Sequence, residues 1–434
     1  MVSKKRHSPW IWIPNLCAAE EIPFAVVTYV ALLMFLQFGS DETMASIYSG
    51  LLFLPWVMKS YLRSKVRNAG FFKRHIHIAE GMIFLCLMGI AVYLTEFRVR
   101  DWGLFIFMFV LSLLCAWHEL IARMYYNRML YPRQQELYNK TKMLSSQMTL
   151  IVTYGVLIII AGFFEVFFRS YQKAWAMESS LVAGGFLLFL LLNFITLQNP
   201  RIHNPYRYES LIGAFKNEMH VIERIKEKPN VARVIFSIII LLLPQALLFN
   251  TRVFFLMAPA TNGGLDCSVQ DVGFAQGTIG VVAFSLGIGL GRLLNEKLGE
   301  MKTFWPMVIV LTLSPLFYML MSQNPLVGNM VALCCMTSLA QFCFGFGLNV
   351  CLVFVHFISG NRYRNTINYL YVPMIAGAMI VPLMASGWLS QLLTYDTYFL
   401  VLTCMAPIIW LVLLCCKTKK VLTNNELANV DNKE

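Results

Sequence analysis

The sequence predicts an all-α polytopic membrane protein, with twelve transmembrane helices in two bundles of six and both termini in the cytoplasm. Hydrophobic residues make up 58% of the 434 residues and charged residues 13%, against roughly 45–50% and about 25% in soluble domains. The apolar residues form runs long enough to cross a bilayer, and the basic residues gather in alternate connections between the runs. This composition excludes a disordered chain, a nucleic-acid-binding domain and an ordinary soluble enzyme.

Twelve apolar runs are candidates for membrane spans, each of which needs about 20 apolar residues to cross roughly 30 Å of hydrocarbon. The second run is the weakest, because Pro55 and Lys59 interrupt it, and the eleventh opens with the polar residues Asn368 and Tyr371. The first run follows a basic N-terminus but is too long for a signal peptide, so we expect an uncleaved first span. The runs lie near residues 11–38, 44–62, 77–95, 102–123, 143–168, 178–197, 231–257, 272–292, 304–322, 327–358, 366–387 and 393–416.

The distribution of Lys and Arg predicts the orientation of the spans. With the N-terminus placed inside, the inner segments hold 30 of the 35 basic residues, and Arg252 lies inside the seventh run. The outer loops hold only four, namely Arg98, Arg100, Arg169 and Lys173. Because positive charge collects on the cytoplasmic side, we expect an even number of spans in the cytoplasmic (inner) membrane with both ends inside. The net charge of +12 therefore indicates orientation and not an anionic partner.

The longest polar connection divides the chain into two halves of six spans each. The predicted organisation is an N-terminal six-helix bundle at 1–197, a cytoplasmic linker at 198–230, a C-terminal six-helix bundle at 231–417 and a polar cytoplasmic tail at 418–434. Apolar residues of the linker recur at helical spacing between charged ones, which predicts an amphipathic helix on the inner membrane surface or across the two halves. Two related bundles joined by a cytoplasmic linker are typical of secondary transporters.

Glycines are concentrated in the eighth run, with G-x-x-x-G spacings at 273–277 and 287–291. Glycine removes side-chain bulk and lets helices approach closely, so these positions predict tight helix packing, with helix sliding during a conformational cycle as the alternative. The G-x-G-x-G stretch before Arg292 resembles a nucleotide-binding loop. It lacks the preceding strand and the βαβ setting that such a loop requires.

Ionisable residues inside the runs indicate function, since each costs at least about 2.5 kcal/mol to insert and is retained mainly where it meets a cavity or a partner. A carboxyl group whose protonation follows its surroundings is what proton coupling requires. The proton-coupling candidates are Glu20 and Glu21 in the first run, and His118 and Glu119 in the fourth.

A bundle of these helices would bring the four candidates together with Lys59 and Glu80 in one inner-half cavity. Lys59, which closes the second run, is a substrate-binding candidate. The alternatives are a structural ion pair such as Lys59 with Glu119, a hydrogen-bonded structural role for His118, and an interfacial position for Glu80.

The second half offers mainly neutral polar groups. Arg252 stands alone in the outer part of the seventh run, which indicates an anionic substrate group or an inward carboxylate, with snorkelling to the outer interface as the alternative. Together these groups suit a polar organic solute better than a bare metal ion. The further substrate-binding candidates are Gln245, Asn250, Gln341, Asn349, Asn368 and Tyr371.

No catalytic motif is present in the sequence. There is no G-x-S-x-G, no P-loop and no H-E-x-x-H, because the pair His118–Glu119 is followed by Ala122 where the second histidine would stand. The sequence therefore predicts no enzyme, no metal site and no cofactor. The expected partners are a small organic solute, protons as the coupling ion and the lipid bilayer, with no nucleic acid and a functional monomer.

The six-plus-six plan resembles the major facilitator superfamily, and three stretches resemble its AmpG-type muropeptide permeases and related acetyl-CoA-transporter-like members. Residues 48–59 (YSGLLFLPWVMK) resemble the second span of that group, with its Leu-Pro-x-x-x-Lys step. Residues 115–125 (CAWHELIARMY) resemble its fourth span, where Glu119 stands at the first acidic position and Arg123 at the second. Residues 258–291, with Asp271, resemble its seventh-to-eighth span region.

The resemblance implies alternating access by rocking of two bundles, driven by protons, with Lys59 and Glu119 facing the central cavity. Muropeptide specificity is not carried over, because Arg123 reverses the charge of the group's second acidic position. We therefore expect a secondary transporter of a polar organic solute. The alternative is a transporter-like membrane sensor that binds its solute without moving it.

Overall fold

The structure is a computed structural model, and it describes residues 8–59, 72–198, 229–323, 328–359, 364–416 and 418–422. Almost all of the predicted linker, including its amphipathic helix, lies outside the described residues. The chain forms two compact units. The first holds Met1–Ser40 and Met58–Lys216, and the second holds Asp41–Val57 and Asn217–Glu434.

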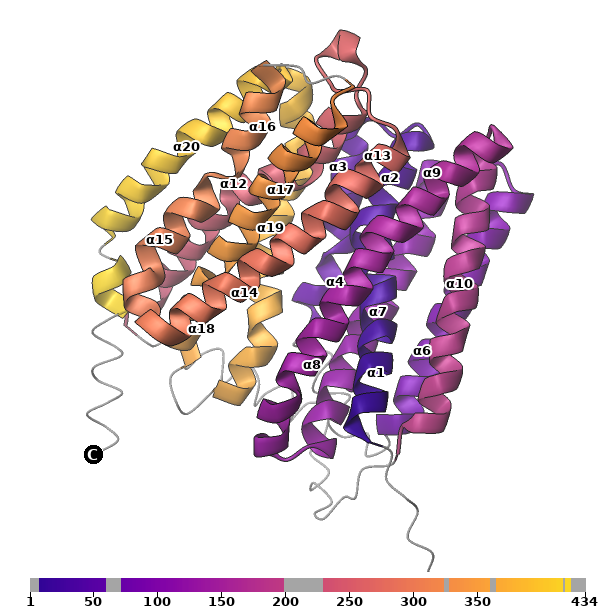
Figure 1. The fold of residues 1–434 in the computed structure, drawn as a ribbon, viewed down its shortest axis with the longest axis horizontal. Coiled ribbons are helices and arrows are strands. Elements are labelled where there is room, and N and C mark those ends of the chain that lie inside the picture. The colour runs from indigo at the N-terminus through magenta and orange to yellow at the C-terminus, as the bar shows by residue number, and fades with distance from the viewer. Residues whose placement is uncertain are drawn as a thin grey trace, which may run out of the picture. The chain divides into compact units, whose positions relative to one another are not determined.

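The first unit is built from long helices that pack along their lengths (Figure 1). α1 packs on α8, α7 and α10, while α6 packs on α7 and α10. One π-helical segment interrupts the first span, and another interrupts the helix that ends at Phe168. The elements are α1 (Pro9–Ala25), η1 (Val26–Val30), α2 (Ala31–Gln37), α6 (Phe72–Glu96), α7 (Asp101–Met129), α8 (Pro132–Ile151), η2 (Val152–Val156), α9 (Leu157–Phe168) and α10 (Tyr171–Thr196).

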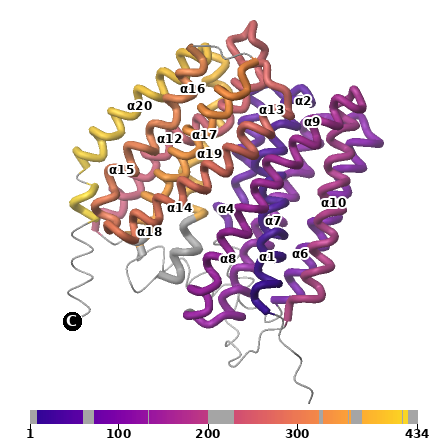
Figure 2. Tube along the Cα trace, in the orientation of Figure 1, coloured from indigo at the N-terminus to yellow at the C-terminus, as the bar shows by residue number. Residues whose placement is uncertain are grey.

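The second unit contains more interrupted helices, and α15 and α16 can be traced as successive parts of one span in Figure 2. Its closest helix pairs are α14 with α17, α3 with α19, and α12 with α19. The elements are α3 (Glu42–Leu52), α4 (Leu54–Val57), α12 (Val231–Met257), η3 (Ala260–Asn262), α13 (Val269–Val272), η4 (Gly273–Gly280), α14 (Val281–Leu298), α15 (Glu300–Thr312), α16 (Ser314–Gln323), α17 (Met330–Leu348), α18 (Val350–Ser359), α19 (Arg364–Leu392) and α20 (Tyr395–Cys415).

Eleven helices of the described residues are long and apolar enough to cross a membrane, and they correspond to eleven of the twelve predicted spans. The second predicted span is not among them. Its chain forms α3 and α4, which a turn at Phe53 separates, and Pro55 follows at the second position of α4. Proline has no backbone N–H to continue the ladder of helix hydrogen bonds. The two compact units also divide this span, since it passes from the second unit to the first at Met58.

The G-x-x-x-G spacing at 287–291 packs helices as predicted. A Cβ atom at Gly287 would lie 2.4 Å from the carbonyl oxygen of Phe342 on α17, and one at Gly291 would lie 2.8 Å from that of Phe346. Gly289, between them, faces open space within 4 Å. The two outer glycines therefore let the backbones of α14 and α17 come together.

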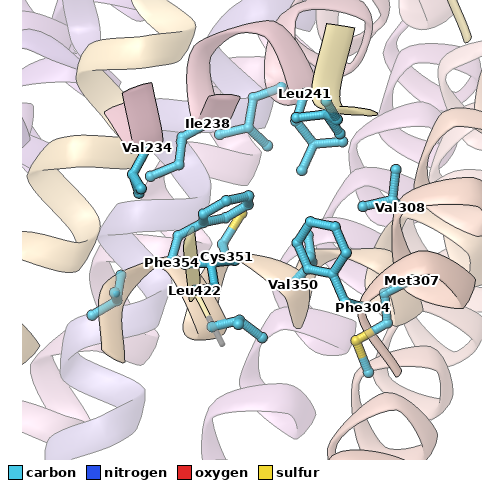
Figure 3. Packing of buried hydrophobic residues seen from close by; sticks show 14 of the residues in the cluster. Val234, Ile238, Leu241, Phe304, Met307, Val308, Val350, Cys351, Phe354 and Leu422 are labelled. Atoms are coloured by element: carbon cyan, nitrogen blue, oxygen red, sulfur yellow. The ribbon is translucent and has the colours of Figure 1, made fainter. Parts of the chain in front are cut away.

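An apolar core holds α12, α15 and α18 together in the second unit (Figure 3). The rings of Phe304 and Phe354 meet edge to face with their centroids 5.9 Å apart. This geometry is the one that aromatic pairs prefer. Other residues of the core are Val234, Ile238, Leu241, Met307, Val308, Val350, Cys351 and Leu422.

Candidate functional site

A cluster of charged side chains lies between helices of the first unit, centred on Glu119 of α7. Lys59, only 2% exposed, forms an ion pair through Nζ with Glu119 Oε1. Arg123, one turn further along α7, donates from Nη2 to the same oxygen at 3.0 Å. One partly buried carboxylate thus compensates two cations, so its loss would leave a buried lysine without its counter-charge.

Two carboxyl groups of α1 extend this cluster toward α8. Glu21 accepts a hydrogen bond from Ser146 through Oε1. Glu20 interacts electrostatically with Lys142 of α8 and also with Glu119 and His118 of α7. The structure therefore brings Glu20, Glu21, His118, Glu119 and Lys59 into one region of the first unit. Whether this region carries protons stays a prediction.

Glu80 is a further carboxyl group in the interior of the first unit. It is fully buried in α6, and its carboxylate meets polar groups of three helices. Asn193 Nδ2 of α10 donates to Oε1 at 2.7 Å, His118 Nε2 of α7 lies 3.4 Å from the same oxygen, and His77 Nδ1 lies 3.4 Å from Oε2. The rotation of α6 thus turns Glu80 toward α7 and α10, and its depth relative to the membrane interface stays a prediction.

The two π-helical segments of the first unit meet through a polar contact that the sequence did not predict. Thr28 of η1 donates to the carbonyl oxygen of Phe24 at 2.8 Å, so its hydroxyl accepts the hydrogen bond from Tyr154 of η2, also at 2.8 Å. The Tyr29 and Tyr154 rings lie 5.1 Å apart. Single π-helical turns inside α-helices are frequent at functional sites, so this contact joins the candidate site.

In the second unit, Arg252 of α12 has an aromatic contact and no acidic partner among the described residues. Its guanidinium lies over the Phe249 ring at 4.7 Å, and its Nε is buried without a hydrogen-bond partner in the described part of the chain. Because Phe249 is one turn closer to the start of the helix, the side chain turns back from the helix end at Met257. This direction does not favour snorkelling past that end.

Three other candidates of the second unit, Gln245, Asn250 and Asn349, hydrogen-bond within the protein. Gln245 donates to the carbonyl oxygen of Leu311 at 2.6 Å, and Asn250 accepts from Ser49 at 3.2 Å while its Nδ2 has no partner among the described residues. Asn349 donates to carbonyl oxygens of both α14 and α17, at 3.1–3.3 Å. Gln341 is buried beside Gly280. The side chains of Asn368 and Tyr371, on α19, lie outside the described residues.

Several functional candidates escaped the sequence reasoning. Asn193 had a usable signal, because it is the one polar residue in the apolar stretch 186–195 (FLLFLLLNFI). Ser146 and Tyr154 had none, since serine and tyrosine are common in spans. Glu178 of α10 is 1% exposed, and its Oε1 has no hydrogen-bond partner in the described segments. Within those segments no group of three or more His, Cys, Asp and Glu residues has a geometry that could hold a metal ion.

No family model and no curated protein matches the sequence, whereas solved structures do. The nucleoside transporter NupG matches with a TM-score of 0.69 at 13% identity, covering 94% of this chain and 98% of its own. A D-xylose–proton symporter matches with a TM-score of 0.61 at 15% identity, covering 93% and 95%. A bacterial homologue of the human lysosomal transporter Spinster, inward-facing and unoccupied, matches with a TM-score of 0.66 at 12% identity, covering 97% of both chains.

These matches show that the chain shares the fold of these transporter structures. It is a multi-pass membrane protein of that architecture. The resemblance stated from the sequence is confirmed at this level. The AmpG-type subfamily stays a prediction, since no structure of that group is among these neighbours.

Proposed function

We propose that the protein is a secondary active transporter that moves a polar organic solute across the cytoplasmic membrane by alternating access, driven by protons. The fold it shares with a nucleoside transporter and a D-xylose–proton symporter supports this class. The proposal includes twelve spans in two six-helix bundles, both termini in the cytoplasm, and action as a monomer.

One observation carries the proposal, namely the buried pairing of Lys59 with Glu119 on the fourth span. Placing charges inside a membrane helix is costly, and residues that remain there usually mark ion or substrate pathways. A purely structural role is a weak explanation, because a buried ion pair often stabilises a protein no better than apolar residues of similar volume.

The pair provides a chemical mechanism for coupling. With Glu119 ionised, Lys59 and Arg123 are both compensated. When a proton binds to Glu119, the carboxyl group becomes neutral and Lys59 is left buried without its counter-charge. That arrangement is unfavourable, so it favours either a conformational change or binding of an acceptor group of the solute by Lys59. Release of the proton restores the pair and completes the cycle.

Counterflow in proteoliposomes tests the class of protein. Vesicles containing the purified protein and loaded with an unlabelled nucleoside or pentose are diluted into the labelled solute, and binding of the same solutes is measured by calorimetry. We expect transient accumulation of label that depends on the protein and on the solute inside. A solute that binds but gives no counterflow would contradict the transporter and establish the alternative, a membrane sensor.

Arg252→Ala is expected to weaken solute binding, because we propose that its guanidinium, which has no acidic partner among the described residues, binds an acceptor group of the solute. A hydrogen bond to a charged group contributes about 1.5–3 kcal/mol, so the half-saturating concentration for counterflow should rise at least about tenfold. Arg292→Ala is the matched control, since that side chain is 44% exposed and pairs with Glu296 at 3.2 Å. Equal half-saturating concentrations in the two variants would exclude Arg252 from the binding site.

A further inference from the structure

Glu80 is a buried carboxyl group whose only ion-pair partners among the described residues are histidines. His118 and His77 approach its two oxygens at 3.4 Å each, and no Lys or Arg in the described segments pairs with it. Glu80 and His118 are both fully buried. The group thus differs from the Glu119 cluster, where the partners of the carboxylate are a lysine and an arginine.

The charge balance of this group favours a bound proton. An ionised Glu80 between two neutral imidazoles would be a buried charge without a counter-charge, which is strongly destabilising. One proton removes the problem, either on the carboxylate or on an imidazole that then forms an ion pair with it. The environment therefore favours a state with one proton more than an ionised Glu80 and two neutral imidazoles would hold.

Like His77, whose Nε2 is also buried without a hydrogen-bond partner among the described residues, His118 has a vacant position for that proton. Its Nε2 faces Glu80, which in the neutral ring places the N–H there, and its Nδ1 is buried with no hydrogen-bond partner among the described residues. Asn193 Nδ2 donates to the same carboxylate oxygen at 2.7 Å and holds it in place. A proton on Nδ1 would turn the ring into a cation beside the carboxylate and supply the counter-charge that an ionised Glu80 lacks.

We propose that Glu80 and His118 form a second proton-binding site, separate from Glu119 and located on a different face of α7. The groups that face His118 are Glu80 and His77 from α6 and the neutral Asn193 from α10. Glu20 of α1 interacts with it electrostatically, and Glu119 follows it in the sequence, paired with Lys59 and Arg123. A proton on His118 therefore acts on two acidic groups, Glu80 and Glu20.

Nuclear magnetic resonance of the protein labelled with ¹⁵N-histidine and reconstituted in lipid bilayers tests this site without any solute. The ring nitrogens report the protonation state of each of the seven histidines, and His118→Gln identifies the signal that belongs to His118. We expect this ring to gain a proton as the pH is lowered across the range in which the protein stays folded. A His118 ring that keeps one protonation state throughout that range would overturn the proposal.

Two variants that should move the His118 midpoint in opposite directions test whether Glu80 is its partner. Glu80→Gln removes the negative charge and should move the His118 midpoint to lower pH by about one unit or more. Asn193→Leu removes a donor to the carboxylate and should move the midpoint to higher pH, because the unshared charge attracts the proton on His118 more strongly. If Glu80→Gln does not fold, Asn193→Leu decides the question.

His75→Gln is the control, since it removes an imidazole of the same helix that does not contact Glu80. It should leave the His118 midpoint unchanged. A midpoint that is the same in the original protein, Glu80→Gln and Asn193→Leu would show that the two groups do not share a proton site. Because no solute is involved, this outcome is independent of the transport experiments.

Discussion

Glu119→Gln is expected to abolish proton-driven accumulation of the solute while counterflow remains measurable. Glutamine has nearly the same shape and can still accept hydrogen bonds from Lys59 and Arg123, but it cannot bind and release a proton. With a pH gradient imposed across proteoliposomes, uptake should fall to the level seen without a gradient. Acidification of the lumen on addition of solute, followed with a pH-sensitive dye inside the vesicles, should be lost as well.

Three controls make this result specific to Glu119. Glu165→Gln changes a carboxyl group of the same unit that accepts a hydrogen bond from Gln37 at 3.0 Å, and it should leave coupling unchanged. Glu119→Asp keeps a protonatable group at a shorter reach and should recover part of the accumulation. Thermal unfolding of each variant shows whether the protein is folded. Full accumulation and unchanged acidification by folded Glu119→Gln would exclude this residue as the coupling group.

The membrane spans were largely predictable because hydropathy is a property of local sequence. Eleven predicted spans correspond to long apolar helices, whose ends lie within about ten residues of the prediction. The second span was the weakest for a physical reason that the structure makes plain. Pro55 and Lys59 interrupt its apolar run, and the chain there divides into α3 and α4.

The charged residues of the site were also predictable, but their partners were not. Glu119 and Lys59 stand out because ionisable groups in apolar runs are costly. The partners of Glu80 depend on how α6 is rotated about its own axis. Glu80 follows Lys73 by seven residues, which is two helical turns, and only the packing of α6 decides which neighbouring helix its carboxylate meets. Asn193, which binds it, lies 113 positions away in the sequence.

Neutral polar residues were the hardest to interpret from sequence. Asn349 was a substrate-binding candidate, and in the structure its amide donates to carbonyl oxygens of α14 and α17. An asparagine in an apolar run has the same sequence signal whether its amide meets a solute or a neighbouring backbone. The glycine pattern was more informative, because small residues at a spacing of four have a direct steric consequence.

Gly287→Leu is expected to destroy the packing of α14 on α17, whereas Gly289→Leu should leave the protein folded. Even a Cβ atom at Gly287 would lie 2.4 Å from the carbonyl oxygen of Phe342 and 2.8 Å from the amide nitrogen of Phe346. Both obstacles are backbone atoms of α17, so no rotamer change can relieve the contact. Overpacking in a well-packed core costs about 1–3 kcal/mol, and here a whole helix must move.

The two glycines make a matched pair on one helix. They are two residues apart and therefore face different sides of α14, and Gly289 has nothing within 4 Å of its Cβ position. Replacing either glycine raises helix propensity by up to about 1 kcal/mol, so propensity cannot explain a difference between them. Thermal unfolding and size-exclusion profiles of the two variants in detergent measure that difference. Equal stability of both would show that the 287–291 glycines do not hold α14 against α17.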